Sequence, residues 1–289
     1  MKHAVLCIAL LGFAGAAVSA DAGSGRTGFR VCADPNNLPF SDRKHHGFEN
    51  RLAALWADSL GLELEYTWFP QRLGFVRNTL KAKDENGVFK CDIVMGVAQG
   101  FDLLQTTKPY YRSTYVLVYA RGRGLDDVQS GADFLGLDAT RKGKLRIGVF
   151  DQTPGAAWLA RHGLGRQMVP YPALAGDPEA YPGQLVKEAL VEGELDAVVI
   201  WGPIGGYFAR RSESVEIVVV PLESEPGIRF DYAISAGVRY GDSEGKRELE
   251  TLMDEHADDI AELLESFNVP LLELEASTGS EEADEDDDD

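Results

Sequence analysis

The stretch FRVCADPNNLPF, residues 29–40, decides the fold. Its first five residues are mostly apolar and β-prone, which predicts a buried strand, and a polar loop begins at Asp34. Residues 48–60 follow with apolar side chains at helical spacing and predict an amphipathic helix. A strand, a loop and a helix in this order favour an α/β fold, in which helices cover a mainly parallel sheet.

The alternation of strands and helices continues along the chain and starts again near residue 146. Further strands are predicted at residues 62–68, 92–96, 115–119, 146–150, 196–200 and 215–220. Further helices are predicted at residues 75–83, 155–162, 184–192, 205–211 and 249–267. Two such series predict two lobes, each with its own sheet and helices.

Both ends of the chain differ from this pattern. Residues 1–20 contain Lys2 and His3, an apolar run over residues 4–17 and the small residues Val18, Ser19 and Ala20, which is typical of a cleaved secretory signal peptide. The apolar run is shorter than the roughly 20 residues that span a bilayer, so we expect no transmembrane anchor. Residues 273–289 hold ten acids and no base, which predicts a disordered acidic tail.

The charge of the chain excludes one class of partner. The formal net charge is -19, and the tail contributes about half of it. A nucleic-acid binder needs clustered Lys and Arg to neutralise phosphates, so nucleic acid is not expected as a partner.

Two cysteines, Cys32 and Cys91, remain after the signal peptide. An even number in an oxidising compartment permits a disulfide between them, and two buried thiols are the alternative. The sequence has no Cys/His spacing typical of a metal site, no Gly-x-Ser-x-Gly motif and no Gly-rich phosphate loop. We therefore expect neither an enzyme nor a cofactor.

Six short motifs occur in an order that resembles one family. They are residues 29–40, Gly47-Phe48-Glu49, residues 90–95 (KCDIVM), Pro109-Tyr110-Tyr111, residues 145–149 (LRIGV) and residues 193–197 (GELDA). In this order they resemble the type II periplasmic binding proteins of solute-binding protein family 3. The resemblance covers residues 28 to about 270 and implies two lobes joined by a double crossover hinge.

A narrower resemblance rests on longer stretches. Residues 32–40, 66–80, 91–97 and 107–115 are similar to the quinoprotein dehydrogenase-associated binding proteins of methylotrophs, and so is WGPIGGYF at residues 201–208. This group is associated with methanol oxidation by dehydrogenases that carry pyrroloquinoline quinone (PQQ). The resemblance implies a periplasmic accessory role, with the dehydrogenase and its cytochrome c as partners.

The resemblance also implies where the chain changes lobes. We expect the crossings near residues 120–123 and 221–230, which hold Gly or Pro between predicted strands. Lobe 1 is then residues 28–120 plus 228–272, and lobe 2 is residues 121–227.

Ligands in such folds bind where the carboxyl ends of strands meet. The residues that follow predicted strands are therefore our candidates for a cleft that binds a polar ligand: Asp34, Asn36, Asn37, Gln71, Arg72, Gly96, Gln99, Gln152, Thr153 and Trp201. Each has a structural alternative, since Asp34, Asn36 and Asn37 suit a turn, Gln71 and Arg72 suit a surface pair, and Trp201 suits a core.

One departure from the family bears on the ligand. Amino-acid-binding members place an Arg after the third strand to clamp the carboxylate of the ligand, whereas residues 99–107 contain no Arg. The sequence therefore favours an accessory protein of a quinoprotein dehydrogenase. The alternatives are the binding subunit of an ABC importer, with a permease as partner and a small polar solute as ligand, and, more distantly, a periplasmic enzyme.

Overall fold

The structure is a computed structural model that describes residues 26–71, 74–173 and 180–274. The predicted signal peptide and residues 275–289 of the predicted tail lie outside these ranges, as does Arg72. Within the described ranges, no helix is long and apolar enough to cross a membrane.

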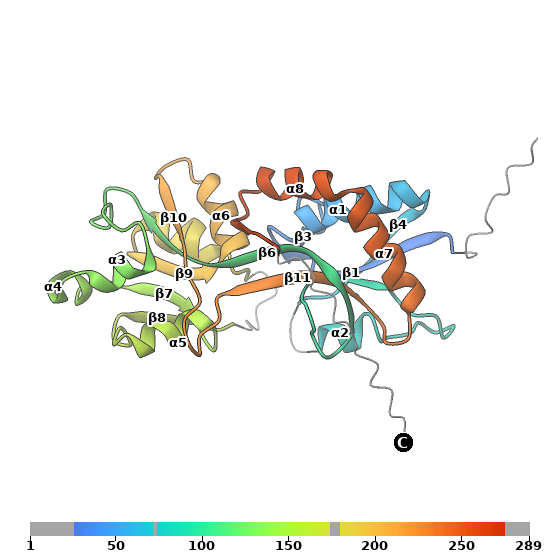
Figure 1. Ribbon diagram of the computed structural model, residues 1–289, viewed down its shortest axis with the longest axis horizontal. Coiled ribbons are helices and arrows are strands. Elements are labelled where there is room, and N and C mark those ends of the chain that lie inside the picture. The colour runs from blue at the N-terminus through green and yellow to red at the C-terminus, as the bar shows by residue number, and fades with distance from the viewer. Residues whose placement is uncertain (1–25, 72–73, 174–179, 275–289) are drawn as a thin grey trace, which may run out of the picture.

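The elements of lobe 1 come from both ends of the described chain (Figure 1). The first group is β1 (Gly28–Ala33), β2 (Asn36–Asn37), β3 (Ser41–Asp42), α1 (Phe48–Leu60), β4 (Glu63–Trp68), α2 (Phe75–Asn78), β5 (Ile93–Ala98) and β6 (Gln105–Ala120). The last group is β11 (Asp231–Val238), α7 (Ser243–Glu255), α8 (Ala257–Ser266) and β12 (Leu271–Leu272).

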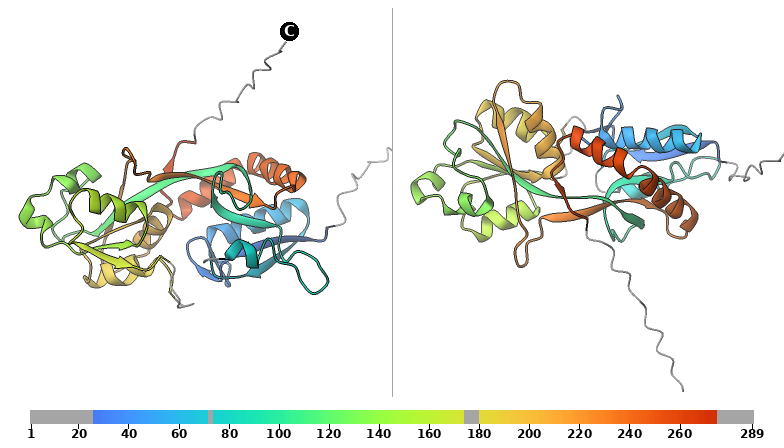
Figure 2. Two further views of the ribbon diagram at one scale, coloured as in Figure 1. Left: turned by 90° about the horizontal axis from the view of Figure 1, so that it is seen from below. Right: turned by 45° about the horizontal axis from the view of Figure 1, so that its top comes forward.

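Lobe 2 contains the elements between these groups. They are α3 (Gly131–Gly136), α4 (Ala139–Lys142), β7 (Ile147–Phe150), α5 (Pro154–Arg161), β8 (Met168–Tyr171), the π-helix η1 (Leu185–Leu190), β9 (Ala197–Trp201), α6 (Gly202–Arg210) and β10 (Ile217–Pro221). Figure 2 shows the two lobes side by side, with β6 running from one into the other.

Ten strands form one sheet, whose main path is β4-β1-β5-β11-β6-β9-β7-β8, with β10 and β12 also paired to β6, and β2 and β3 form a separate two-stranded sheet. In lobe 1, β1 pairs in parallel with β4 and β5, and in lobe 2, β7 pairs in parallel with β8 and β9. The carboxyl ends of β1, β7 and β8 carry residues of one cavity, described below. The α/β fold with two lobes and a double crossover is therefore as predicted.

The first crossing lies earlier than the sequence suggested. Strand β6 pairs with β11 up to Thr114 and with β9 and β10 from Tyr115, so the change of lobe occurs between these two residues and not near residues 120–123. The strand continues unbroken across this point. The sequence predicted only its second half, because the first half of β6 is polar and contains Pro109.

The return crossing lies between β10 and β11. The backbone N–H of Leu222 donates to the carbonyl of Tyr115, and the N–H of Tyr115 donates to the carbonyl of Phe230. The limits of the lobes as units that fold or move on their own stay a prediction.

The predicted C-terminal helix is two helices, because the chain leaves helical geometry at His256. The His256 ring lies 2.7 Å from the hydroxyl of Ser59 and 2.8 Å from a carboxylate oxygen of Asp259. Both helices bury apolar side chains, so the apolar stripe that predicted one helix continues through the break.

Cys32 and Cys91 form a disulfide, with their Cα atoms 5.4 Å apart. The bond joins β1 to the segment that enters β5, and both cysteines are buried beside Phe75 and Leu80. It therefore ties the end of β1, from which the loop at Asp34 starts, to the segment before β5.

Candidate functional site

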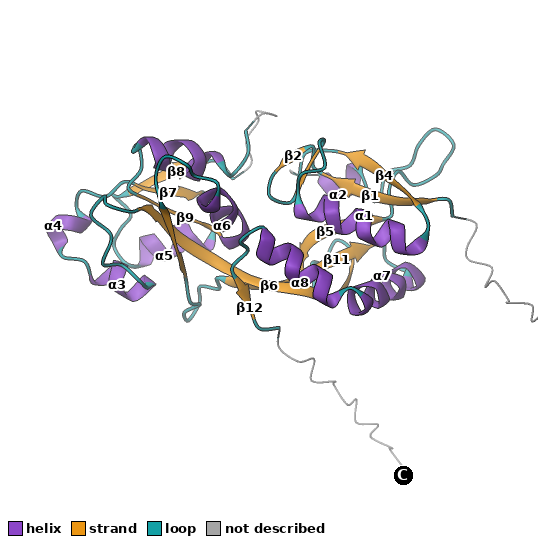
Figure 3. Cartoon of the chain, turned by 90° about the horizontal axis from the view of Figure 1, so that it is seen from above, coloured by secondary structure: helices purple, strands orange, loops and turns teal. Residues whose placement is uncertain are grey.

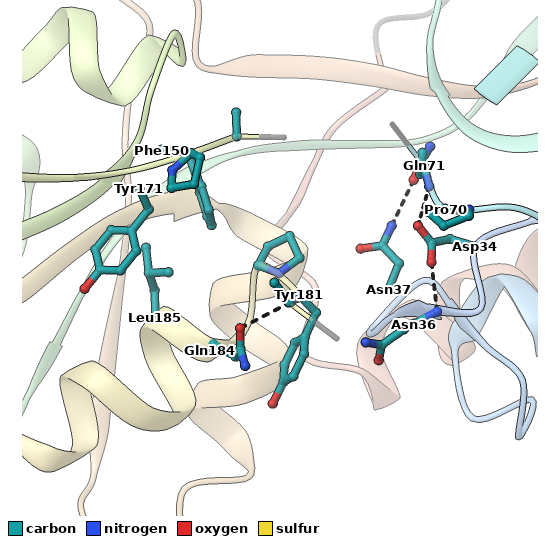
Figure 4. Close-up of a pocket in the computed structure, with 14 residues that line it drawn as sticks. Asp34, Asn36, Asn37, Pro70, Gln71, Phe150, Tyr171, Tyr181, Gln184 and Leu185 are labelled. Carbon is teal, nitrogen blue, oxygen red and sulfur yellow. Dashed lines mark hydrogen bonds between the residues drawn. The ribbon is translucent and has the colours of Figure 1, made fainter. Parts of the chain in front are cut away.

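A cavity of about 240 Å³ lies between the two lobes. Figure 4 shows its two walls, one from lobe 1 and one from lobe 2. The residues that line it are Asp34, Asn36, Asn37, Pro70, Gln71, Phe150, Tyr171, Pro172, Ala173, Ala180, Tyr181, Pro182, Gln184 and Leu185.

The lobe 1 wall is polar and is built on the loop that follows β1. The Asp34 carboxylate accepts hydrogen bonds from the backbone N–H groups of Asn36 and Gln71, so it holds two loops together. The side-chain amide of Asn37 donates to the side-chain oxygen of Gln71 at 2.8 Å. These bonds fix the amide side chains at the edge of the cleft (Figure 4).

The lobe 2 wall is aromatic and apolar. Phe150 ends β7 and Tyr171 ends the neighbouring β8, and their ring centroids lie 6.4 Å apart. Tyr181 packs on Phe208 with centroids 5.8 Å apart, and its backbone N–H donates to the side-chain oxygen of Gln184. Rings from three segments therefore line the lobe 2 side of the cavity, opposite the polar wall (Figure 4).

The charge of the cavity lining is negative. Asp34 is the only ionisable acid or base among the lining residues that the structure describes, apart from the tyrosines. Arg112, the first arginine after the Pro-Tyr-Tyr motif, is bonded to Asp231 away from this cavity. A ligand carboxylate would meet no cation on the described walls, which agrees with the missing arginine clamp.

A second carboxyl group, that of Glu49, lies close enough to Asp34 to interact with it electrostatically. Glu49, in the first turn of α1, is half-buried against Gly96, where an added Cβ would come within 2.1 Å of its side-chain oxygen. Burial and the nearby Asp34 raise the pKa of Glu49 from 4.5 to about 8. Burial also raises the pKa of Tyr110 and Tyr111 well above its ordinary value, so both phenols stay neutral. The protonation state of Glu49, which does not itself line the cavity, is thus sensitive to pH near 8.

The structure brings together four of the predicted site residues: Asp34, Asn36, Asn37 and Gln71. Arg72 lies outside the described residues. The other five, Gly96, Gln99, Gln152, Thr153 and Trp201, are not among the residues that line the cavity.

The surroundings of these five residues explain why they lie elsewhere. The N–H of Gly96 is bonded to the phenol oxygen of Tyr110, and that of Gln99 to the carbonyl of Ala233. Gln152 is exposed in a left-handed turn (φ 60°), and the Thr153 hydroxyl donates to the carbonyl of Phe150 directly before α5.

Trp201 packs at the hinge between Tyr115 and Tyr232, with centroids 5.5 and 5.9 Å away. Trp201 therefore packs among aromatic side chains, as the alternative of a core residue implies, and does not line the cavity.

The aromatic residues of the lobe 2 wall were missed as site residues. Tyr171-Pro172 and Tyr181-Pro182 are two Tyr-Pro pairs that flank the segment after β8. The repeated Tyr-Pro pairs after a strand were the sequence signal that could have identified them.

Among the described residues, no three His, Cys, Asp or Glu side chains are grouped closely enough to hold a metal ion.

Comparison with known proteins shows clear similarity over nearly the whole chain. No protein-family model matches. Protein MoxJ of Paracoccus denitrificans is 27% identical over 275 residues, which cover 90% of this chain and 95% of MoxJ. The crystal structure of the periplasmic binding protein XoxJ from Methylobacterium extorquens AM1 is 34% identical, with a TM-score of 0.66, and the match covers 85% of this chain and 100% of XoxJ.

A more distant match shows the fold alone. The ancestral amino-acid-binding protein AncCDT-1, a precursor of cyclohexadienyl dehydratase, is 19% identical with a TM-score of 0.57. The match covers 84% of this chain and 96% of AncCDT-1.

Proposed function

Since this chain belongs to solute-binding protein family 3, in the group of MoxJ- and XoxJ-type periplasmic binding proteins, we propose that it is an accessory protein of a PQQ-dependent methanol or alcohol dehydrogenase. It acts in the periplasm, after cleavage of its signal peptide, and aids the maturation or activity of the dehydrogenase. Its partners are the dehydrogenase and the cytochrome c of the same system. The role is binding rather than catalysis.

The observation that carries this proposal is the character of the cleft. An aromatic and proline-lined wall faces amide side chains, and the only charged side chain on the described walls is the acid Asp34. Such a surface suits an uncharged segment of a protein better than a free amino acid, whose carboxylate needs a cation. Tyr residues in a partly exposed cleft also match the composition of protein-binding hot spots.

A capture experiment with the neighbouring dehydrogenase tests the proposal. The tagged, mature chain should retain the dehydrogenase from periplasmic extract, and the Tyr171→Ala variant should retain much less. Tyr240→Ala is the matched control, because Tyr240 is 63% exposed and lies outside the cleft. A deletion strain should also show reduced dehydrogenase activity that plasmid-borne protein restores. Absence of capture together with normal activity in the deletion strain contradicts the proposal.

The amide side chains of Asn37, Gln71 and Gln184 favour a second candidate, the binding subunit of an ABC importer for a small polar solute. A thermal-shift screen of polar solutes separates the two, because a ligand selective for the folded state raises its stability by mass action. A strong hit from a solute that a whole-cell assay shows to be imported would support this candidate.

A further inference from the structure

We propose that the cleft binds an extended, proline-containing protein segment in a polyproline II-like conformation, and that this segment carries no acidic residue. The proposal rests on the proposed function, and it names the class of segment that the cleft takes.

The first argument comes from the rings and prolines of the walls. Phe150, Tyr171 and Tyr181 line the cavity together with Pro70, Pro172 and Pro182. Polyproline II segments bind in grooves lined by aromatic rings, because their prolines pack on ring faces and their conformation is already formed. The lobe 2 wall has this composition.

The second argument comes from hydrogen-bond donors. The side-chain oxygens of Gln71 and Gln184 already accept bonds from Asn37 and from the backbone of Tyr181. The NH₂ groups of the two glutamines have no partner among the described residues. A proline-containing segment offers carbonyl acceptors but few N–H donors, so it matches walls that present amide donors.

The third argument excludes another mode of peptide binding. Strand β8 is at the outer edge of the sheet and leads into the cleft, so an extended peptide could in principle pair with it. Pro170 lies within β8 and Pro172 follows it, and neither has a backbone N–H to donate. Addition of a strand at this edge is therefore disfavoured, which leaves contacts through side chains.

The size and charge of the cavity define the segment further. Its volume of about 240 Å³ is below the roughly 300–1,000 Å³ of pockets that enclose drug-sized molecules. A cavity of this size suits a short stretch of a chain better than a whole drug-sized molecule. Because Asp34 is the only charged side chain on the described walls, acidic residues near the stretch are repelled and basic ones are favoured.

Calorimetric titration with blocked synthetic peptides tests the proposal. The probes are decaproline, a Gly-Ser decapeptide, an amphipathic helical peptide, and decaproline flanked by either two Lys or two Asp. Decaproline should bind at least tenfold more tightly than the Gly-Ser and helical peptides. The Lys-flanked form should bind more tightly than the Asp-flanked form, and the difference should shrink at high salt.

Variants then locate the site. Tyr181→Ala and Gln184→Leu should each weaken binding of decaproline about tenfold or more, whereas Tyr240→Ala should leave it unchanged. Circular dichroism and the melting temperature show whether each variant is folded. If Tyr181→Ala is not folded, Gln184→Leu still tests the site, because Leu is close to Gln in size.

Three results overturn the inference: no binding of decaproline, equal binding of the Gly-Ser peptide, or preference for the helical peptide. They are distinguishable from failure of the proposed function. If the dehydrogenase is captured but decaproline neither binds nor competes with it, only the inference fails. If decaproline binds and the dehydrogenase is not captured, the chemistry of the site stands and the assignment of its partner fails.

Discussion

The ring of Phe267 stacks on the ring of Tyr207, with centroids 5.5 Å apart and planes 16° from parallel. Phe267 directly follows α8 of lobe 1, and Tyr207 lies in α6 of lobe 2, so the stack joins the lobes. Figure 3 shows α8 near α6. The guanidinium groups of Arg51 and Arg211 lie over the Phe267 ring, at 5.1 and 5.7 Å from its centroid. The C-terminal segment is thus a third connection between the lobes, in addition to the two crossings.

Removal of this ring should loosen the connection. Phe267 is buried, so Phe267→Ala should lower the free energy of unfolding by about 3–5 kcal/mol. Urea denaturation measures this loss, and hydrogen exchange in α6 should become faster. Phe101→Ala is the control, since Phe101 is 38% exposed. An unchanged midpoint for Phe267→Ala would show that the stack does not stabilise the fold.

Gly206 allows the close approach of the same segment. A Cβ at Gly206 would lie 1.9 Å from the backbone oxygen of Asn268. We therefore expect Gly206→Ala to cost about 1–3 kcal/mol, because backbone must move to accommodate the methyl group. Gly136→Ala is the matched control, since no atom lies within 4 Å of its added Cβ. Equal melting temperatures for the two variants would contradict this view of the contact.

The disulfide should contribute strongly to the stability of lobe 1. Cys32 and Cys91 are 59 residues apart in the sequence, and the chain-entropy relation gives about 4 kcal/mol for a loop of this length. Unfolding by urea with and without a reductant measures the contribution, and the Cys32→Ser/Cys91→Ser variant should match the reduced protein. A reduced protein as stable as the oxidised one would refute the expectation.

Glu49 should make stability depend on pH. Its pKa in the folded protein is about 8, against 4.5 without the fold, so between these values the folded state binds more protons than the unfolded state. Stability therefore falls as pH rises through this window. Glu49→Gln should abolish the fall and stabilise the protein at pH near 8 by about 1–3 kcal/mol, because solvent partly screens the charge of the half-buried carboxylate.

Melting temperatures at several pH values test this expectation. Glu63→Gln is the control, because Glu63 is exposed on β4. If the two variants have the same pH profile as the parent protein, burial of Glu49 has no such effect.

The sequence predicted the lobes and one wall of the cleft. Asp34, Asn36 and Asn37 could be placed because they directly follow a strand, and the carboxyl ends of parallel strands meet at a crevice. The same rule does not determine which of the residues that follow a strand line the cavity. Gln99 continues the sheet and Trp201 turns into the hinge, so neither lines the cavity.

The lobe 2 wall depends on tertiary packing, which the spacing of apolar residues in the sequence does not predict. Tyr181 reaches the cleft because its ring packs on Phe208, which is distant in the sequence. The break at His256 was hidden for a similar reason, since two helices that pack on the same core preserve a single apolar stripe.

The most direct test of the central claim is hydrogen exchange of the mature chain with and without its dehydrogenase partner. If the cleft receives a segment of the partner, amides near Asn37, Gln71, Tyr171 and Tyr181 should exchange more slowly in the mixture, and the outer face of α4 should be unaffected. Unchanged exchange on both walls of the cleft, at concentrations where the two proteins associate, would contradict the claim.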